Sequence, residues 1–166
     1  MSVCDYFLKI DGVEGESKDL KHSGELQIVS FSKEAASPRD SATGLVSGKR
    51  RWDLARFSMR MDKSCIFLLK KITENSKIKT AVLTCRKAGG QDTTSKGQPG
   101  QEYFKITFGE AVVAKVSMRG SLDKDPTPIV DFALSFAKIE ESYSTQTQQG
   151  TLGGALSYAD SIATGA

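Results

Sequence analysis

Alternation of apolar and polar residues with a period of two is the sequence feature that most constrains the fold of this chain. It occurs in several short runs, which are separated by clusters of Gly, Ser, Asp and Pro. In the clearest run, Ile129 to Lys138, the residues of one face are Val130, Phe132, Leu134 and Phe136. A strand buried on one face requires this pattern, and repeated short strands of this kind favour an antiparallel β-barrel or sandwich.

Further runs with the same period predict more strands along the chain. Glu102 to Phe108 and Ala111 to Met118 lie on either side of Gly109-Glu110, a dipeptide that we expect to form a tight hairpin turn. The remaining strand candidates are Cys4 to Ile10, Glu25 to Ser32, Asp53 to Met61, and Lys77 to Lys87. The pattern therefore predicts a mainly β fold, a small antiparallel β-barrel or two packed sheets.

One segment has helical periodicity. Asp62 is placed to cap its amino end, and Asn75-Ser76 closes it. The expected buried stripe consists of Cys65, Ile66, Leu68, Leu69 and Ile72. Three charged residues fall outside that stripe and predict a solvated face, namely Lys70, Lys71 and Glu74. The fold is thus expected to contain a single α-helix.

Among the segments without the strand pattern, two bear on function and on domain organisation. The stretch from Lys33 to Arg51 is long for a barrel connection and predicts an extended loop with a function of its own. From Tyr143 onward the chain is rich in Ser, Thr, Gln, Gly and Ala, so we expect poor order unless a neighbour stabilises it. We therefore divide the chain into a β-barrel domain, residues 1–149, and a Gly/Ala/Ser-rich C-terminal tail, residues 150–166.

Composition excludes several protein classes. The 166 residues suit one domain, and a net charge of +3 is too small to indicate a nucleic-acid partner by itself. The longest apolar runs fall far short of the ~20 residues of a membrane span, and the charged amino end does not resemble a signal peptide. Cys4, Cys65 and Cys85 have apolar neighbours and no metal-ligand spacing, so reduced core cysteines made in the cytosol are expected.

Residues suited to catalysis are scarce. His22 is the sole histidine, and its polar neighbours favour a solvated or turn-stabilising role, so His22→Ala is expected to lower stability little. The stretch Gly44 to Arg50 has the wrong glycine spacing for a phosphate loop. The basic cluster Lys49-Arg50-Arg51 is the best nucleic-acid signal, but a weak one. The chain is not expected to be an enzyme or to use a cofactor or metal.

Several segments resemble one known family in residues and in order. The amino end, from Tyr6 to Asp19 with His22 and then Glu25 to Ser32, is similar to the opening of the haemolysin-coregulated protein (Hcp) family. Further matching segments follow in the family's order: Met61 to Ser64, Cys85 to Gly90, Tyr103 to Phe108, and Phe132 to Glu140. The resemblance covers about residues 3 to 149 and implies a compact β-barrel with one helix.

The resemblance also implies a function. Members of the family are subunits of hexameric rings that stack into the inner tube of a type VI secretion system, beneath its spike protein and inside a contractile sheath. Some members hold effector proteins in the ring lumen. The chain is therefore expected to be cytoplasmic before firing and then secreted without a signal peptide, with no nucleic-acid partner and no membrane insertion. A lipocalin-like ligand-binding barrel is the first alternative. A small hydrolytic effector, which would need a nucleophile and a base, is the second.

Two groups of residues are the candidate sites. The long loop is expected to dock on the next ring, and acidic residues of that ring, among Glu14, Glu16 and Asp19, would face its cations. The loop residues assigned to ring stacking are Pro38, Arg39, Asp40, Gly44, Gly48, Lys49, Arg50 and Arg51. Ser30 and Ser32 are assigned to the lumen and to effector contact. Strict alternation places these serines on the same face as Ile28, opposite Val29 and Phe31.

Overall fold

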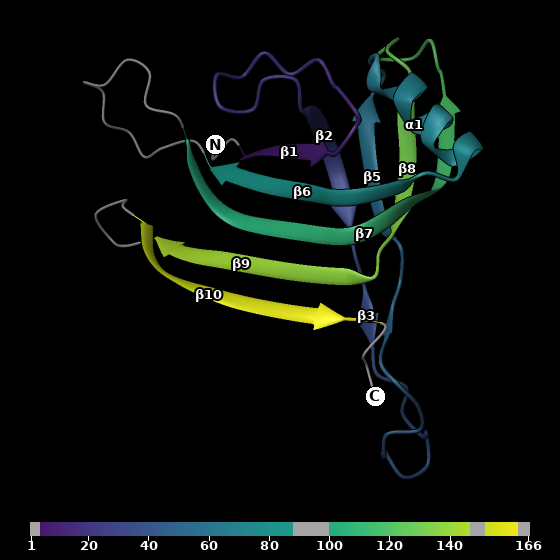
Figure 1. Ribbon diagram of the computed structural model, residues 1–166, viewed down its shortest axis with the longest axis vertical. Coiled ribbons are helices and arrows are strands. Elements are labelled where there is room, and N and C mark those ends of the chain that lie inside the picture. The colour runs from purple at the N-terminus through teal and green to yellow at the C-terminus, as the bar shows by residue number, and fades with distance from the viewer. Residues whose placement is uncertain (1–3, 88–99, 147–151, 163–166) are drawn as a thin grey trace.

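Strands dominate the chain, and one helix interrupts their succession (Figure 1). The computed structural model describes residues 4–87, 100–146 and 152–162. The strands are β1 (Cys4–Ile10), β2 (Leu26–Ser32), β3 (Ala35–Ala36), β4 (Arg51–Trp52), β5 (Ala55–Arg60), β6 (Lys77–Lys87), β7 (Gln101–Arg119), β8 (Ile129–Ser135), β9 (Lys138–Gln146) and β10 (Leu152–Ser161). The helix α1 spans Ser64–Glu74. The mainly β prediction is confirmed.

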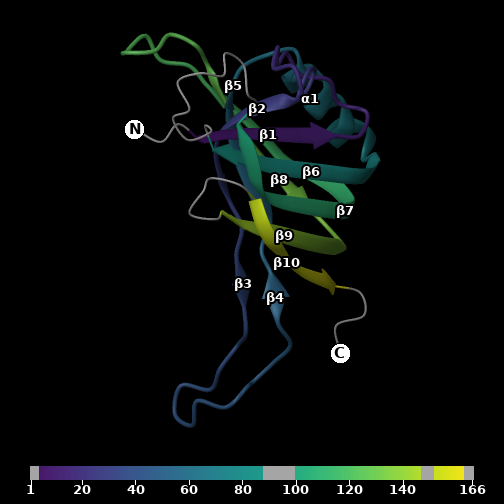
Figure 2. The ribbon, with the colours of Figure 1, turned by 90° about the vertical axis from the view of Figure 1, so that its left-hand side faces the viewer.

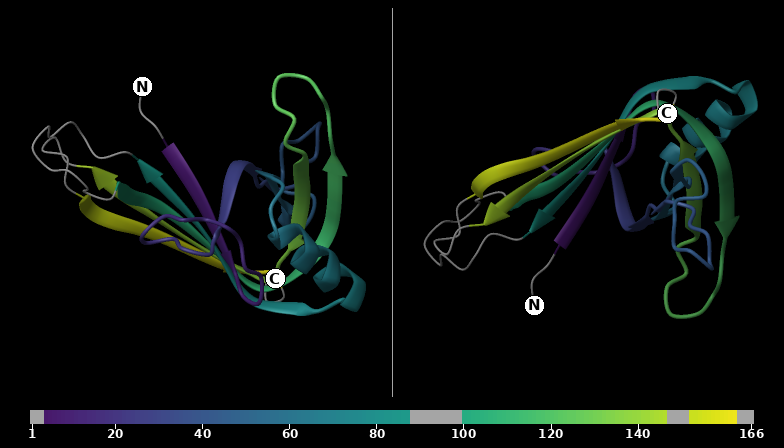
Figure 3. Two further views of the ribbon diagram at one scale, coloured as in Figure 1. Left: turned by 90° about the horizontal axis from the view of Figure 1, so that it is seen from above. Right: turned by 90° about the horizontal axis from the view of Figure 1, so that it is seen from below.

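Six strands close into an antiparallel barrel. Their order is β7-β6-β1-β2-β5-β8, and β8 returns to β7 to complete the closure. Strands β9 and β10 extend the sheet beyond β7. Seen along the vertical axis of Figure 1, the strands form two layers that diverge toward one end, and β7 curves from one layer into the other (Figure 3). The barrel with added strands agrees with the predicted architecture.

The segment around Gly109-Glu110 differs from the predicted hairpin. Residues 101–119 form one strand, β7, whose amino-terminal part pairs with β9 and whose carboxy-terminal part pairs with β8. Glu110 has a φ of 49°, the left-handed conformation, and the pairing with β6 continues across it. The dipeptide thus bends the strand without reversing it, because both sides remain hydrogen-bonded to the same neighbour.

The helix lies where the sequence predicts it. The Asp62 carboxylate accepts a hydrogen bond from the backbone N–H of Ser64 at 2.8 Å, and Asn75 ends the helix with a left-handed φ of 50°. Cys65 and Leu68 are buried in the core, whereas Ile66 is 66% exposed. The predicted stripe is therefore wrong at Ile66. The face of the helix that contacts the barrel is narrower than the stripe of five apolar residues that the sequence predicts.

Buried side chains fill the barrel interior. Phe57 stacks on Phe132 and meets Phe108 edge-on, and Phe108 contacts Phe136. Leu8, Leu26, Met59 and others complete this core, and burial of each large apolar side chain contributes about 1.5–3 kcal/mol. The filled interior removes the basis for the lipocalin-like alternative, which needs an open cavity inside the barrel.

The long loop and the tail have contrasting outcomes. Residues 33–52 form a hairpin that projects well beyond the barrel, with β3 and β4 at its base (Figure 2). This confirms the extended loop. The expectation of a poorly ordered tail is wrong for Leu152–Ser161, which forms β10 and pairs with β9. The division at residue 149 stays a prediction.

No helix in the described ranges is long and apolar enough to cross a membrane.

Candidate functional site

Ser30 and Ser32 lie on a polar outer surface of the barrel, which we call the polar face. It consists of Ser30, Ser32, Arg56, Ser58, Arg60, Lys115, Ser117, Arg119 and Asp131, from β2, β5, β8 and the carboxy-terminal part of β7. Cross-strand pairing connects Ser30 with Ser58, Ser58 with Asp131, and Asp131 with Ser117. The central part of the face lines a shallow hollow of about 360 Å³.

A β-bulge determines which way these serines point. The register of β2 against β5 shifts between Ile28 and Ser30, so Val29 is an extra residue that is 56% exposed. Ile28 and Phe31 therefore both face the core, and Phe31 packs edge-on against Tyr6 at 5.2 Å between ring centroids. The predicted sharing of one face by Ile28 and the serines is wrong. Ser30 and Ser32 still point outward together.

A second bulge lies on the opposite margin of the polar face. The register of β7 against β8 shifts between Val113 and Lys115, so Val113 and Val116 both contact the core although they are three residues apart. Strict alternation over this run predicts that Val112, Ala114, Val116 and Met118 share one face, and the bulge contradicts this because Ala114 is the inserted residue. Both bulges present polar side chains of the margin strands to solvent.

The predicted stacking residues lie on the projecting hairpin, residues 33–52. Asp40 organises the tip: its carboxylate accepts hydrogen bonds from the N–H groups of Ala42 at 2.9 Å and Thr43 at 2.8 Å. These bonds, with that of the Thr43 hydroxyl, hold the pKa of Asp40 below its ordinary value. Gly44 has a φ of +71° and donates its N–H to the Asp40 carbonyl at 2.8 Å. The tip is thus a folded turn that only a residue tolerant of positive φ can close.

The sides of the hairpin are also paired. Arg39 forms a bridge with Val46, and the N–H of Ser47 donates to the carbonyl of Pro38 at 3.0 Å. Gly48 lies beside the Pro38 ring. A Cβ placed at Gly48 would be 3.6 Å from Pro38 Cγ, which is an ordinary van der Waals distance. All eight predicted stacking residues therefore lie on one projecting element, and one of them, Arg50, is also bound to another part of the chain.

Arg50 is held by the C-terminal strand. Its guanidinium donates to both carboxylate oxygens of Asp160, with Nε 2.7 Å from Oδ2, and Trp52 Nε1 donates to Oδ2 at 2.9 Å. The Arg50 hydrogen bonds, followed by that of Trp52, hold the pKa of Asp160 far below its ordinary value. We call Arg50, Trp52 and Asp160 the hairpin clamp. Sequence reasoning missed it, although Asp160 is the sole acidic residue of the tail.

Two of the three acidic residues expected to meet the hairpin cations already have partners in the chain. Arg86 Nη1 lies 2.8 Å from an Asp19 oxygen, and Lys63 Nζ lies 3.0 Å from a Glu14 oxygen. Lys49 and Arg51 remain exposed on the hairpin. Any contact of the hairpin with another subunit therefore depends on these two cations more than on Arg50.

His22 is buried in a network of charged groups, which we call the histidine cluster. Its Nδ1 lies 2.8 Å from Glu25 Oε2, its Nε2 lies 2.9 Å from Glu102 Oε1, and its ring stacks on Phe7 at 4.4 Å. The Arg86 guanidinium lies 4.8 Å from the centroid of the Phe7 ring and pairs with Asp5 and Asp19. The predicted solvated histidine is wrong, and its contact with Glu25 agrees with the turn-stabilising alternative.

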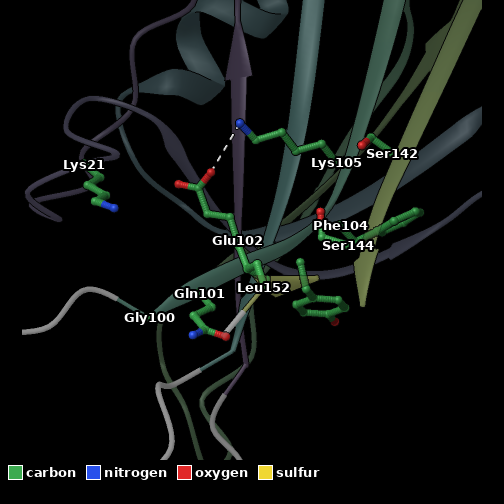
Figure 4. Close-up of a pocket in the computed structure, with 10 residues that line it drawn as sticks. Lys21, Gly100, Gln101, Glu102, Phe104, Lys105, Ser142, Ser144 and Leu152 are labelled. Atoms are coloured by element: carbon green, nitrogen blue, oxygen red, sulfur yellow. Dashed lines mark ion pairs between the residues drawn. The ribbon is translucent and has the colours of Figure 1, made fainter. Parts of the chain in front are cut away.

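A second hollow lies beside this cluster, over the paired strands β7 and β9 (Figure 4). It has a volume of about 380 Å³, and its charged residues include Lys105 and Glu102, which form an ion pair at 3.2 Å. The residues that line it include no histidine or cysteine, so they supply no nucleophile and base pair of the usual kinds. Within the described ranges, no group of three His, Cys, Asp or Glu side chains could hold a metal ion.

The cysteines differ in exposure. Cys65 and Cys85 are buried, and burial raises the pKa of the Cys85 thiol to about 12, so this thiol stays protonated at neutral pH. Cys4 is exposed, which corrects the expectation that all three lie in the core.

Comparison with known proteins agrees with this structure. A sequence profile described as "Type VI secretion system effector, Hcp" matches residues 7–143. The protein hcp1 of Pseudomonas aeruginosa is 31% identical over 157 residues, which cover 93% of this chain and 92% of the relative.

Solved structures share the fold over nearly their whole length. The crystal structure of Hcp1 from Salmonella typhimurium has a TM-score of 0.76 at 28% identity and covers 100% of this chain and 99% of its own. A type VI secretion system effector from Yersinia pestis has a TM-score of 0.74 at 26% identity, over 95% of this chain and 100% of its own. The Hcp family consists of structural secretion proteins and not of enzymes. The chain therefore belongs to the Hcp family of type VI secretion system proteins.

Proposed function

We propose that this chain is the subunit of the inner tube of a type VI secretion system. Copies of the chain close into a hexameric ring, and the rings stack into a hollow tube that meets the spike protein and lies inside the contractile sheath. Closed cyclic symmetry lets every subunit use the same pair of complementary surfaces. The protein is cytoplasmic before firing and is then exported with the tube.

The projecting hairpin is the observation that best supports this proposal. The barrel closes without it and only Trp52, at its base, packs against the core, yet its tip and sides are fixed by the internal hydrogen bonds of Asp40 and Pro38. The hairpin clamp holds its base against β10. An exposed element that is ordered without a packing role suits a contact with another subunit, because little ordering entropy is lost on binding.

Native mass spectrometry and negative-stain electron microscopy of the purified protein test the proposal. We expect hexameric rings at micromolar concentration and stacked rings as the concentration rises. A protein that stays monomeric throughout this range contradicts the tube function.

The hairpin cations provide a test of stacking alone. The double variant Lys49→Glu/Arg51→Glu leaves the hairpin clamp intact, so we expect normal rings that no longer stack. Exposed ion pairs contribute about 0.2–1 kcal/mol each, and repetition around the ring multiplies this effect. Microscopy of tubes and assay of the protein outside the cell measure the outcome.

A matched control is the double variant Lys70→Glu/Lys124→Glu, which changes the net charge equally at exposed sites outside the hairpin. Normal tubes are expected from it. Normal tubes from Lys49→Glu/Arg51→Glu refute the assignment of the hairpin to ring stacking.

We further propose that the polar face lines the ring lumen and that Ser30 and Ser32 contact effector proteins there. The structure meets one condition of this proposal, since Phe31 packs inward and leaves both serines outward. Small hydroxyl side chains give a smooth polar wall, which suits weak and repeated contacts with a carried protein.

A further inference from the structure

Cations are arranged in pairs across the polar face. In one cross-strand row, Arg56 of β5 and Lys115 of β7 lie on either side of Ala133 of β8. In another row, Arg60 and Arg119 lie in the same way on either side of Ile129. Neighbouring strands are ~4.8 Å apart, so the two members of each pair are separated by ~10 Å. The face thus presents a grid of cations around the serine hydroxyls.

The acidic residues near this grid compensate it only in part. Arg56 and Asp53 form a pair at 3.4 Å in which both side chains are about half exposed, and Arg60 pairs with Asp125 at 3.0 Å. Arg119 lies 3.9 Å from Asp131, whose carboxylate also accepts the Ser58 hydroxyl hydrogen bond. Within the described residues, Lys115 has no ion-pair partner. Exposed pairs of this kind are weak, so a carboxylate from another molecule can compete for these cations.

We propose that the polar face binds acidic protein surfaces, which selects cargo with clustered Asp and Glu side chains. This inference rests on the proposed function, since the ring lumen is where repeated copies of the face meet one cargo. Serine hydroxyls and guanidinium groups both donate hydrogen bonds to carboxylates. Each contact is weak and salt-sensitive, and repetition around the ring supplies the avidity.

A protein partner suits this face better than a nucleic acid. Binding of single strands depends on aromatic side chains on which bases stack. The aromatic residues beneath the polar face, Phe57 and Phe132, are 2% exposed and belong to the core. The outward side chains of these strands are hydroxyls, cations, one carboxylate, one amide and small or apolar non-aromatic groups. The face therefore supplies charge and hydrogen-bond donors but no stacking platform.

Binding of a fluorescently labelled poly-L-glutamate peptide, followed by anisotropy, tests this inference on the purified protein. We expect binding at low salt that weakens markedly as the ionic strength rises past the physiological range. Poly-L-lysine of equal length is expected not to bind detectably. The double variant Arg56→Glu/Lys115→Glu is expected to bind polyglutamate at least about tenfold more weakly.

Two further variants make the result specific to the polar face. Lys70→Glu/Lys124→Glu has the same net charge as Arg56→Glu/Lys115→Glu, so the two variants share any long-range effect of charge. Because its polar face is unchanged, it should bind polyglutamate within about twofold of the unchanged protein. Arg56→Lys/Lys115→Arg keeps the cations and should retain binding. The inference is overturned if Arg56→Glu/Lys115→Glu and Lys70→Glu/Lys124→Glu lose polyglutamate affinity equally. It is also overturned if the unchanged protein does not bind polyglutamate at low salt.

Two readouts separate this inference from the proposed function. Microscopy of the same samples shows whether rings form, so a ring that does not bind polyglutamate contradicts the inference alone. A monomer that binds polyglutamate through Arg56 and Lys115 contradicts the tube function alone. A labelled single-stranded oligonucleotide, tested in parallel, is expected to bind no better than polyglutamate, and tighter binding that depends on Arg56 and Lys115 overturns the choice of an acidic protein partner.

Discussion

The variant Gly15→Ala is expected to lower the free energy of unfolding by about 3 kcal/mol or more. A Cβ at this position meets the Glu25 carbonyl oxygen at 2.4 Å and the Leu26 nitrogen at 3.0 Å, which are backbone atoms that no rotamer change can move. The backbone must shift, and the hydrogen bonds from Gly15 to Gly24 and from Ser17 to Glu25 weaken with it. These bonds hold the segment before β2 against the barrel.

Thermal unfolding measures this effect. For a domain of this size, a loss of 3 kcal/mol corresponds to a fall in Tm of roughly 6 to 12 °C. Gly120→Ala is the matched control, because a Cβ there has no atom within 4 Å and the backbone does not have a positive φ. Its Tm should change by little, and equal Tm values for the two variants contradict the close approach at Gly15.

The variant His22→Ala is expected to destabilise the protein by about 2–4 kcal/mol, in contrast to the small loss that the sequence predicts. The imidazole lies between Glu25 and Glu102, and each of its ring nitrogens is within hydrogen-bond distance of one carboxylate. Without it, two partly buried carboxylates of like charge lose their shared partner, and Phe7 loses the ring that stacks on it. Both losses act on the folded state.

The pH dependence of this variant has a definite sign. Burial raises the pKa of Glu102, but Lys105 and then His22 outweigh it and hold this pKa below its ordinary value. The stabilisation from Glu102 is therefore present above the ordinary pKa and lost as pH falls through the lower folded value. We expect the difference in stability between His22→Ala and the unchanged protein to be smaller below about pH 4 than at pH 7, because Glu102 then loses its charge.

Chemical denaturation at both pH values provides the measurement, with Lys21→Ala as a control on an exposed neighbour. His22→Gln should recover part of the loss, because an amide can still donate to one carboxylate. A His22→Ala variant as stable as Lys21→Ala at pH 7 shows that the buried cluster contributes little to stability.

Much of the fold could be predicted from local pattern. The bounds of β1 and β6 agree with the predicted runs, and Val130, Phe132, Leu134 and Phe136 are buried as the alternation requires. A side chain on every second residue faces the core wherever a strand is regular, so period two carries this information directly. The helix ends also follow from local signals, since Asp62 and Asn75 act on adjacent backbone groups.

The candidate sites depended on features that alternation cannot reveal. The bulges at Val29 and Ala114 each insert one residue, which changes the face of every following side chain and places Ser30 and Ser32 opposite Ile28. Glu110 bends β7 where the sequence indicates a turn, because pairing with β6 on both sides outweighs the local preference of Gly-Glu. The local sequence pattern does not show where a bulge or bend occurs. The pairing of each strand with its neighbours determines this.

The sequence by itself determined most of the strands, the helix, the long loop and the family, because these follow from residues close together in the chain. Tertiary structure alone decided the partners of the charged groups. Arg50 meets Asp160 across 110 residues, and His22 meets Glu102 across 80. The strength of a charge pair depends on distance and burial, and both are set only when distant segments of the barrel come together.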